Sequence, residues 1–157
     1  MGNLELLNNK IYPYKLLRFP YYITSLLVFL IGLSIYILFR NNNILLFQVF
    51  PKPVFLEMFP LRVRADSILM SLFLYNLPDG LWFLSGLLII RAVWLTNIKW
   101  RLVYFCIFSI IALSMEIFQI FDTIPGTFDF LDIVFMAIFS ILENSFFYLF
   151  VKRNILC

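Results

Sequence analysis

Ionisable side chains inside long apolar runs are the residues of this chain whose types and spacing could carry chemistry. The chain has 157 residues, of which 63% are hydrophobic and only 13% are charged. A charged group is costly to bury in lipid, so each one inside an apolar run is a candidate functional residue. Four carboxylates meet this description: Asp79, Glu116, Asp132 and Glu143.

Asp79 belongs to the segment Asn76-Leu-Pro-Asp-Gly-Leu-Trp82, near the middle of an apolar run. Pro78 lacks a backbone donor and crowds the carbonyl four residues before it, and Gly80 loosens the chain further. The sequence therefore predicts a break or kink in this helix. Two interpretations stay open: the break forms the wall of a polar cavity, with Asn76 as a supporting residue, or it only orients two half-helices.

A second group of polar residues surrounds the loop between two later apolar runs. Glu116 and Gln119 are three residues apart, so they share one helix face near the end of the third run. Asp129 and Asp132 open the fourth run, where the helix dipole favours carboxylates. Capping of that helix by Thr127 or Asp129 would account for Asp129 alone, but it does not explain Glu116 or Gln119.

Glu143 follows Asp132 by eleven residues, close to three helical turns or about 16 Å, so both side chains lie on one stripe of the fourth run. Such a stripe has two interpretations. It is either a proton or ion path, or a set of hydrogen-bonding groups that join neighbouring helices. Asn144 lies beside Glu143 and adds to its polarity.

Four apolar stretches are long enough to cross a hydrocarbon core, which takes about 20 residues. They cover residues 19–39, 67–90, 102–121 and 130–151. Residues 44–60 are also apolar but contain Pro51, Pro53 and Pro60, which predicts an interfacial or re-entrant segment. The expected fold is therefore all-α: one integral membrane domain over residues 1–157, a bundle of four transmembrane helices with a proline-interrupted segment between the first and second.

The basic residues predict the orientation, because Lys and Arg in short loops stay on the cytoplasmic side. With both termini inside, eight basic residues are cytoplasmic and four are external. The cytoplasmic set is Lys10, Lys15, Arg18, Arg91, Lys99, Arg101, Lys152 and Arg153, and the external set is Arg40, Lys52, Arg62 and Arg64. We expect a multi-pass protein of the inner (plasma) membrane whose main partner is the lipid bilayer.

Composition also excludes several classes of function. The chain has no histidine and two cysteines, Cys106 and Cys157, which are far apart. This composition predicts no metal site and no cofactor, and it removes the usual base of hydrolases. Basic residues occur singly or in pairs between apolar runs, so we expect no nucleic-acid binding. Cys106 is expected to be a small buried apolar residue.

The pattern Glu116-x-x-Gln119, followed by Pro125-Gly-Thr-Phe-Asp129-x-x-Asp132, resembles the VanZ-like family of small bacterial membrane proteins. The resemblance covers the second to fourth spans, about half of the chain. It implies a cell-envelope location, and the founding member is associated with resistance to a glycopeptide antibiotic. Two positions depart from the family: the histidine usual in the preceding span is absent, and Gly126-Thr127 replace the loop arginine.

Three hypotheses follow for function. The first is a VanZ-like, non-enzymatic envelope protein, active in envelope stress or antibiotic resistance. Its outward-facing acidic pocket is formed by Asp79, Glu116, Gln119, Asp129 and Asp132 and supported by Asn76, Arg62, Arg64 and Glu143. The second is a homo-oligomeric sensor or pore subunit of a stress or phage-defence system, working with a cytosolic protein partner. The third is an intramembrane enzyme acting on a lipid-linked substrate.

Overall fold

The computed structural model describes the backbone of residues 2–39, 67–121 and 128–148, and the side chains of these residues except 2–17, Ile68 and Phe146. All regular structure within these ranges is helical. The proline-interrupted segment 44–60 lies outside the described residues, as do Arg62, Arg64, Pro125, Gly126, Thr127, Lys152, Arg153 and Cys157.

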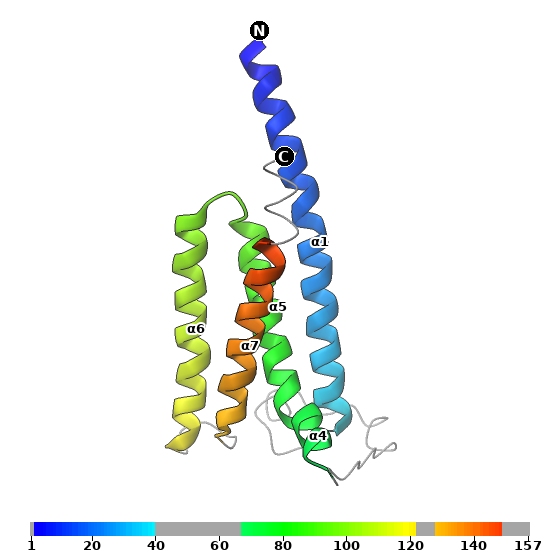
Figure 1. Ribbon diagram of the computed structural model, residues 1–157, viewed down its shortest axis with the longest axis vertical. Helices are drawn as coiled ribbons and strands as arrows, with labels where there is room; N and C mark the ends of the chain where they lie inside the picture. The colour runs from blue at the N-terminus through cyan, green and yellow to red at the C-terminus, as the bar shows by residue number, and fades with distance from the viewer. Residues whose placement is uncertain (1, 40–66, 122–127, 149–157) are drawn as a thin grey trace.

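The first helix, α1, is continuous over Gly2–Phe39. At 1.5 Å per residue its length is about 57 Å, nearly twice the ~30 Å thickness of a hydrocarbon core. Its N-terminal part extends beyond the other helices (Figure 1). The apolar portion of α1, Arg18–Phe39, is long and hydrophobic enough to cross a membrane.

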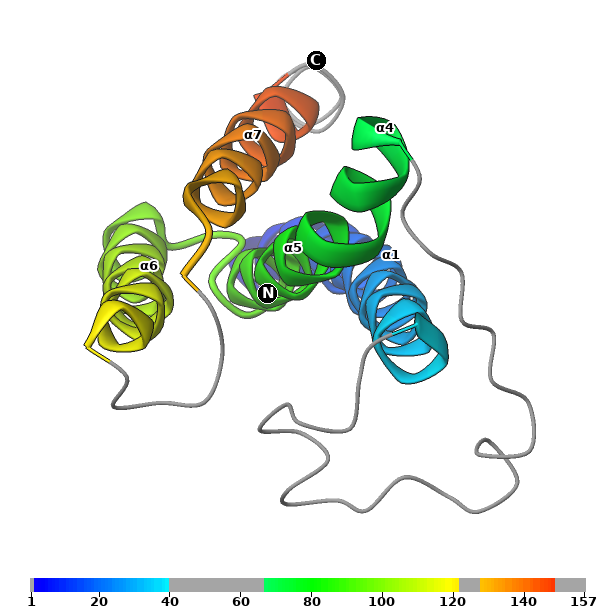
Figure 2. The same cartoon turned by 90° about the horizontal axis from the view of Figure 1, so that it is seen from below.

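The second expected span is a composite helix. It consists of α4 (Ile68–Ser71), a π-helical turn η1 (Leu72–Asn76) and α5 (Leu77–Val93). Seen from below, α4 bends away from the axis of α5 (Figure 2). The predicted irregularity is therefore present, but it precedes Pro78, which lies in the first turn of α5. A proline is tolerated there because the first-turn N–H groups have no partner within the helix.

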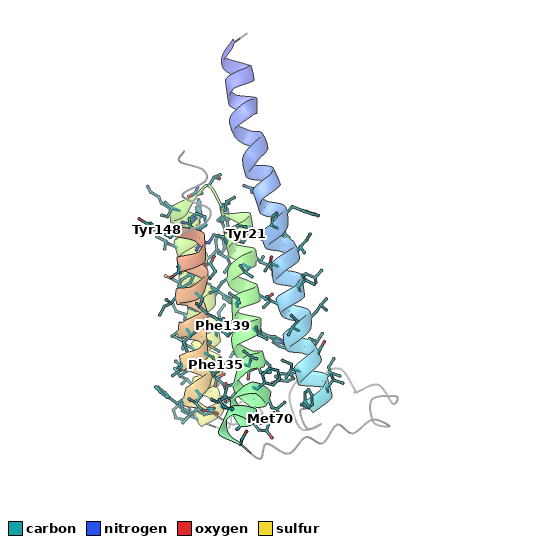
Figure 3. All side chains as sticks on the ribbon, turned by 45° about the vertical axis from the view of Figure 1, so that its right-hand side comes forward. Tyr21, Met70, Phe135, Phe139 and Tyr148 are labelled. Atoms are coloured by element: carbon teal, nitrogen blue, oxygen red, sulfur yellow. The ribbon has the colours of Figure 1, made fainter. Side chains whose placement is uncertain are left out.

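Two further helices lie within the described residues: α6 (Ile98–Ile120) and α7 (Phe130–Phe146). Asn97 caps α6, its side-chain oxygen accepting a hydrogen bond from the Trp100 amide at 3.3 Å. The chain runs along α5, returns along α6 and runs along α7, so α5 and α7 are parallel (Figure 1). The α5–α6 turn lies at one end of the bundle and α4 at the other, near the labelled Tyr21 and Met70 respectively (Figure 3).

The interior helix of the bundle is α5. It lies between α1, α6 and α7 (Figure 2). In the most apolar window of each candidate span, 44% of residues are buried for α4–α5, against 17% for α1 and 6% for α6. The apolar faces of α1 and α6 are therefore available to lipid. Cys106 is exposed on α6, so the expectation that it is buried was wrong.

Small residues allow the helices to approach α5 closely. Ser25 of α1 donates a hydrogen bond to the Ser85 carbonyl at 2.9 Å, and the two hydroxyl oxygens are 3.0 Å apart. A Cβ added at Gly32 would lie 2.8 Å from the Trp82 ring of α5. Small and hydroxylated residues at such contacts are typical of helix packing in membranes.

Three helices are long and apolar enough to cross a membrane: Arg18–Phe39, Leu69–Val93 and Ile98–Ile120. These correspond to the first three expected spans. The fourth expected span, 130–151, is helical over Phe130–Phe146, and a π-helical turn covers Phe147 and Tyr148 at the end of the described segment. Four packed helices therefore form, in agreement with the expected all-α class.

Candidate functional site

The polar groups that α5 and α7 bring together at the α4 end form what we call the Asn76 cluster: Asn76, Asp129 and Asp132. The Asn76 amide nitrogen donates to Asp129 Oδ2 and to Asp132 Oδ1, both at 2.8 Å. Asn76 and Asp132 are only 2% and 6% exposed. One neutral amide therefore holds two carboxylates on one side of a helix–helix contact.

The π-helical turn η1 places Asn76 in this cluster. Asn76 is its last residue, and the Leu77 amide that follows bonds to the carbonyl of Leu72, five residues earlier. The extra residue per turn rotates the side chains that follow relative to those of α4. Such turns are rare, and they occur frequently at functional sites.

Asp129 has two structural roles. It is the N-cap of α7, where its Oδ1 accepts a hydrogen bond of 2.9 Å from the Leu131 amide. The expected capping role of Asp129 is thus confirmed. Its other oxygen, Oδ2, accepts from Asn76, so capping alone does not account for this side chain.

Three of the other expected site residues, Asp79, Glu116 and Gln119, lie at the same end of the bundle. Asp79 is half-buried in the first turn of α5, three positions beyond Asn76. Glu116 is buried and Gln119 half-buried near the end of α6. Glu116 follows Ala112 by four residues, and Ala112 packs against the core, so Glu116 extends the inward face of α6.

Glu143 does not join the Asn76 cluster. It lies towards the opposite end of α7, where Arg91 of α5 donates to its two carboxylate oxygens at 2.5 Å each. Arg91 also donates to Asn144 Oδ1 at 2.8 Å, and its guanidinium lies 4.1 Å from the centre of the Phe147 ring. The side chains of Arg91 and Glu143 are 4% and 3% exposed.

Arg91 is the residue that sequence reasoning missed, because it was counted only among the loop charges that set orientation. A signal was available in the spacing. Asn76, the last residue of η1, precedes Arg91 of α5 by fifteen positions, and Asp129, the N-cap of α7, precedes Glu143 by fourteen. These separations are about 22 Å and 21 Å along two parallel helices, so the two polar pairs match in register.

An apolar layer separates the two polar sites along the α5–α7 contact. Phe83 and Leu87 of α5 pack against Met136 of α7, and Phe105 and Phe108 of α6 cover them. The Phe83 and Phe108 rings stack with centroids 5.3 Å apart. Asp132 and Glu143 therefore take part in two separate helix-to-helix contacts, with this apolar layer between them.

The chemistry open to the Asn76 cluster is that of hydrogen-bond acceptance. An ionised carboxylate accepts about four hydrogen bonds and donates none, so two carboxylates side by side suit a donor-rich cation. Within the described parts of the chain, no three His, Cys, Asp or Glu side chains are placed to hold a metal ion.

No family model, no curated protein and no solved structure matches the chain.

Proposed function

We propose that this chain is a VanZ-like, non-enzymatic membrane protein of the bacterial envelope, and that its Asn76 cluster binds an ammonium group of an envelope component. The ligand is a lipid headgroup or a cell-wall precursor. The observation that carries the proposal is the pair of carboxylates, Asp129 and Asp132, held together by the buried Asn76 amide.

Two carboxylates buried between helices carry an energetic cost. Carboxylates at membrane depth are expensive, and they persist where they bind partners or serve a function. At the contact between α1 and α5 the helices are joined by two neutral hydroxyl groups, Ser25 and Ser85, without any carboxylate. Two carboxylates converging on one amide concentrate acceptor oxygens in a small space, and a group with several N–H donors, such as an ammonium, suits such a set of acceptors.

Orientation supports an external position for this cluster. The greater number of Lys and Arg residues belongs to the side that carries the N-terminus and the α5–α6 turn, which the positive-inside rule assigns to the cytoplasm. The Asn76 cluster lies at the opposite end of the bundle (Figure 1). In this orientation its ligand approaches from the outer leaflet.

The test compares two lipids that differ in hydrogen-bond donation. We would reconstitute the protein in nanodiscs that contain equal amounts of phosphatidylethanolamine and phosphatidylcholine, and measure the lipids retained by native mass spectrometry. Ethanolamine has N–H donors and choline has none. Wild type should retain ethanolamine lipid preferentially, and D132N should lose this preference. K99Q is the control, because exposed Lys99 lies at the other end of the bundle and its replacement leaves no buried charge without a partner.

A cell-wall precursor peptide with a lysine side chain is the second probe, measured by displacement of the retained lipid or by direct binding. Loss of binding of either amine probe in D132N, with K99Q unaffected, supports the proposal. If neither probe distinguishes wild type from D132N while both proteins are folded, the proposal is wrong.

A further inference from the structure

A small pocket opens between α5, α6 and α7 at the end where the α5–α6 turn lies. Its volume is about 60 Å³, enough for a few water-sized groups. Its lining combines charged side chains, those of Arg91, Arg101 and Glu143, with apolar ones that include Leu87, Leu102 and Phe105. A pocket of this size admits a small oxyanion group, and the rest of a larger ligand must lie outside it.

The charges that line the pocket do not cancel. Arg91 is compensated by Glu143 through two hydrogen bonds. Arg101 is half-buried and donates to the Leu95 carbonyl at 3.3 Å, which is a neutral acceptor. Within the part of the chain that the structure describes, no carboxylate lies within ion-pair distance of Arg101. The pocket therefore has one positive charge in excess.

The guanidinium groups of Arg91 and Arg101 both lie against the ring of Phe147. The Arg91 and Arg101 guanidinium carbons lie 4.1 Å and 5.0 Å from the centre of the Phe147 ring. Both distances are within the range of a cation–π interaction, which fixes the position of each planar group. Arginine presents several N–H donors in a rigid fork that matches the oxygens of a phosphate.

The surroundings of the pocket are those of a membrane interface. Trp94, Trp100 and Tyr104 form an aromatic group at the same end, with the Trp94 and Tyr104 rings stacked 5.3 Å apart. Such rings are enriched at the level of lipid headgroups. Leu102, one of the apolar residues that line the pocket, is 56% exposed. The acyl chain of a lipid can therefore lie against α6 while the headgroup of that lipid reaches Arg91 and Arg101.

We propose that this pocket binds the phosphate of an anionic phospholipid, with Arg101 as the group that supplies the uncompensated charge. The argument is independent of the function proposed for the Asn76 cluster. A lipid is favoured over a free phosphate because the apolar lining of the pocket continues onto the exposed surface of α6. Basic pockets between transmembrane helices are suited to such headgroups.

The experiment measures how much phosphatidylglycerol and phosphatidylcholine remain bound when the protein is released from mixed nanodiscs. Wild type should retain phosphatidylglycerol preferentially, and R101Q should reduce that preference about fivefold, as expected for one basic residue at a membrane surface. R101K keeps the positive charge but loses the planar set of N–H donors of the guanidinium, so its preference for phosphatidylglycerol should lie between those of wild type and R101Q. K99Q is the matched control, because exposed Lys99 does not line the pocket.

Three results would overturn the proposal. The first is equal retention of phosphatidylglycerol in folded R101Q and wild type. The second is a reduction by K99Q as large as that by R101Q, which would indicate general surface charge. In the third, millimolar inorganic phosphate displaces the lipid in wild type, which would indicate a site for a free anion. Thermal unfolding of each variant in detergent shows that the comparison is made on folded protein, and D132N should leave this retention unchanged.

Discussion

The guanidinium of Arg91 in α5 donates two hydrogen bonds of 2.5 Å to the two carboxylate oxygens of Glu143 in α7. Both side chains are almost completely buried. Removing one partner of such a pair leaves a charge without compensation in a medium of low dielectric constant, whereas removing both leaves none. The pair therefore behaves as a unit, and double variants can distinguish its contribution from that of each residue.

We expect R91M and E143L each to lower the free energy of unfolding by about 3 kcal/mol or more. The double variant R91M/E143L should cost less than either single variant, because apolar side chains then replace the whole pair. Reversible unfolding in mixed micelles measures these differences. If the cost of the double variant equals the sum of the two single costs, the two residues do not stabilise the fold as a pair.

Asn76 provides a second prediction, because it bonds to two carboxylates. N76L, which has a similar volume, should lower the free energy of unfolding by about 1–3 kcal/mol through the loss of a shared buried donor. N76D should cost more, since it adds a third carboxylate to Asp129 and Asp132. The same unfolding measurement applies. Stability unchanged in N76D would contradict the close approach of these three side chains.

The two roles of Asp129 can be separated by substitution. D129S keeps an N-cap oxygen, but its side chain is too short to accept the hydrogen bond from Asn76. D129A loses both the cap and this hydrogen bond. We expect D129A to be less stable than D129S by about 1 kcal/mol, the usual contribution of a cap. Both variants should weaken the amine binding proposed above to the same extent, because each lacks the carboxylate. Unequal binding at equal folding would show that the cap, rather than the carboxylate, matters for the ligand.

Much of the helical architecture could be predicted from the sequence, because length and hydropathy determine membrane spans. The irregularity near Pro78 was also predictable, but for another reason, since proline removes a backbone donor. The helix faces that contact one another could not be predicted from the sequence. Most positions of α1 and α6 are apolar, so no stripe of hydrophobic residues marks the inward face, and packing decides the pairing instead.

The candidate site shows the same division. Asp129 and Asp132 were expected beside each other because both belong to the first turn of one helix. Their bond to Asn76 depends on the π-helical turn, whose position within the second span the sequence did not specify. Arg91 was missed because a basic residue at the end of a span has an ordinary explanation in topology. Its partner becomes apparent only when α5 and α7 are known to be parallel neighbours.

Gly32 tests the contact between α1 and α5. A Cβ at this position would lie 2.8 Å from the Trp82 ring and 3.3 Å from the Leu81 Cβ. Trp82 has little room to move, because Phe29 and Tyr36 of α1 stack on it at 5.6 Å and 5.3 Å. G32A should therefore lower the free energy of unfolding by about 1–3 kcal/mol, the usual cost of overpacking, and G32L should cost more. S34A is the control, because Ser34 is exposed on α1 and its hydroxyl bonds only within its own helix. If G32A is as stable as S34A, α1 does not approach α5 as closely as the structure places it, and the Ser25–Ser85 hydrogen bond would then also be in question.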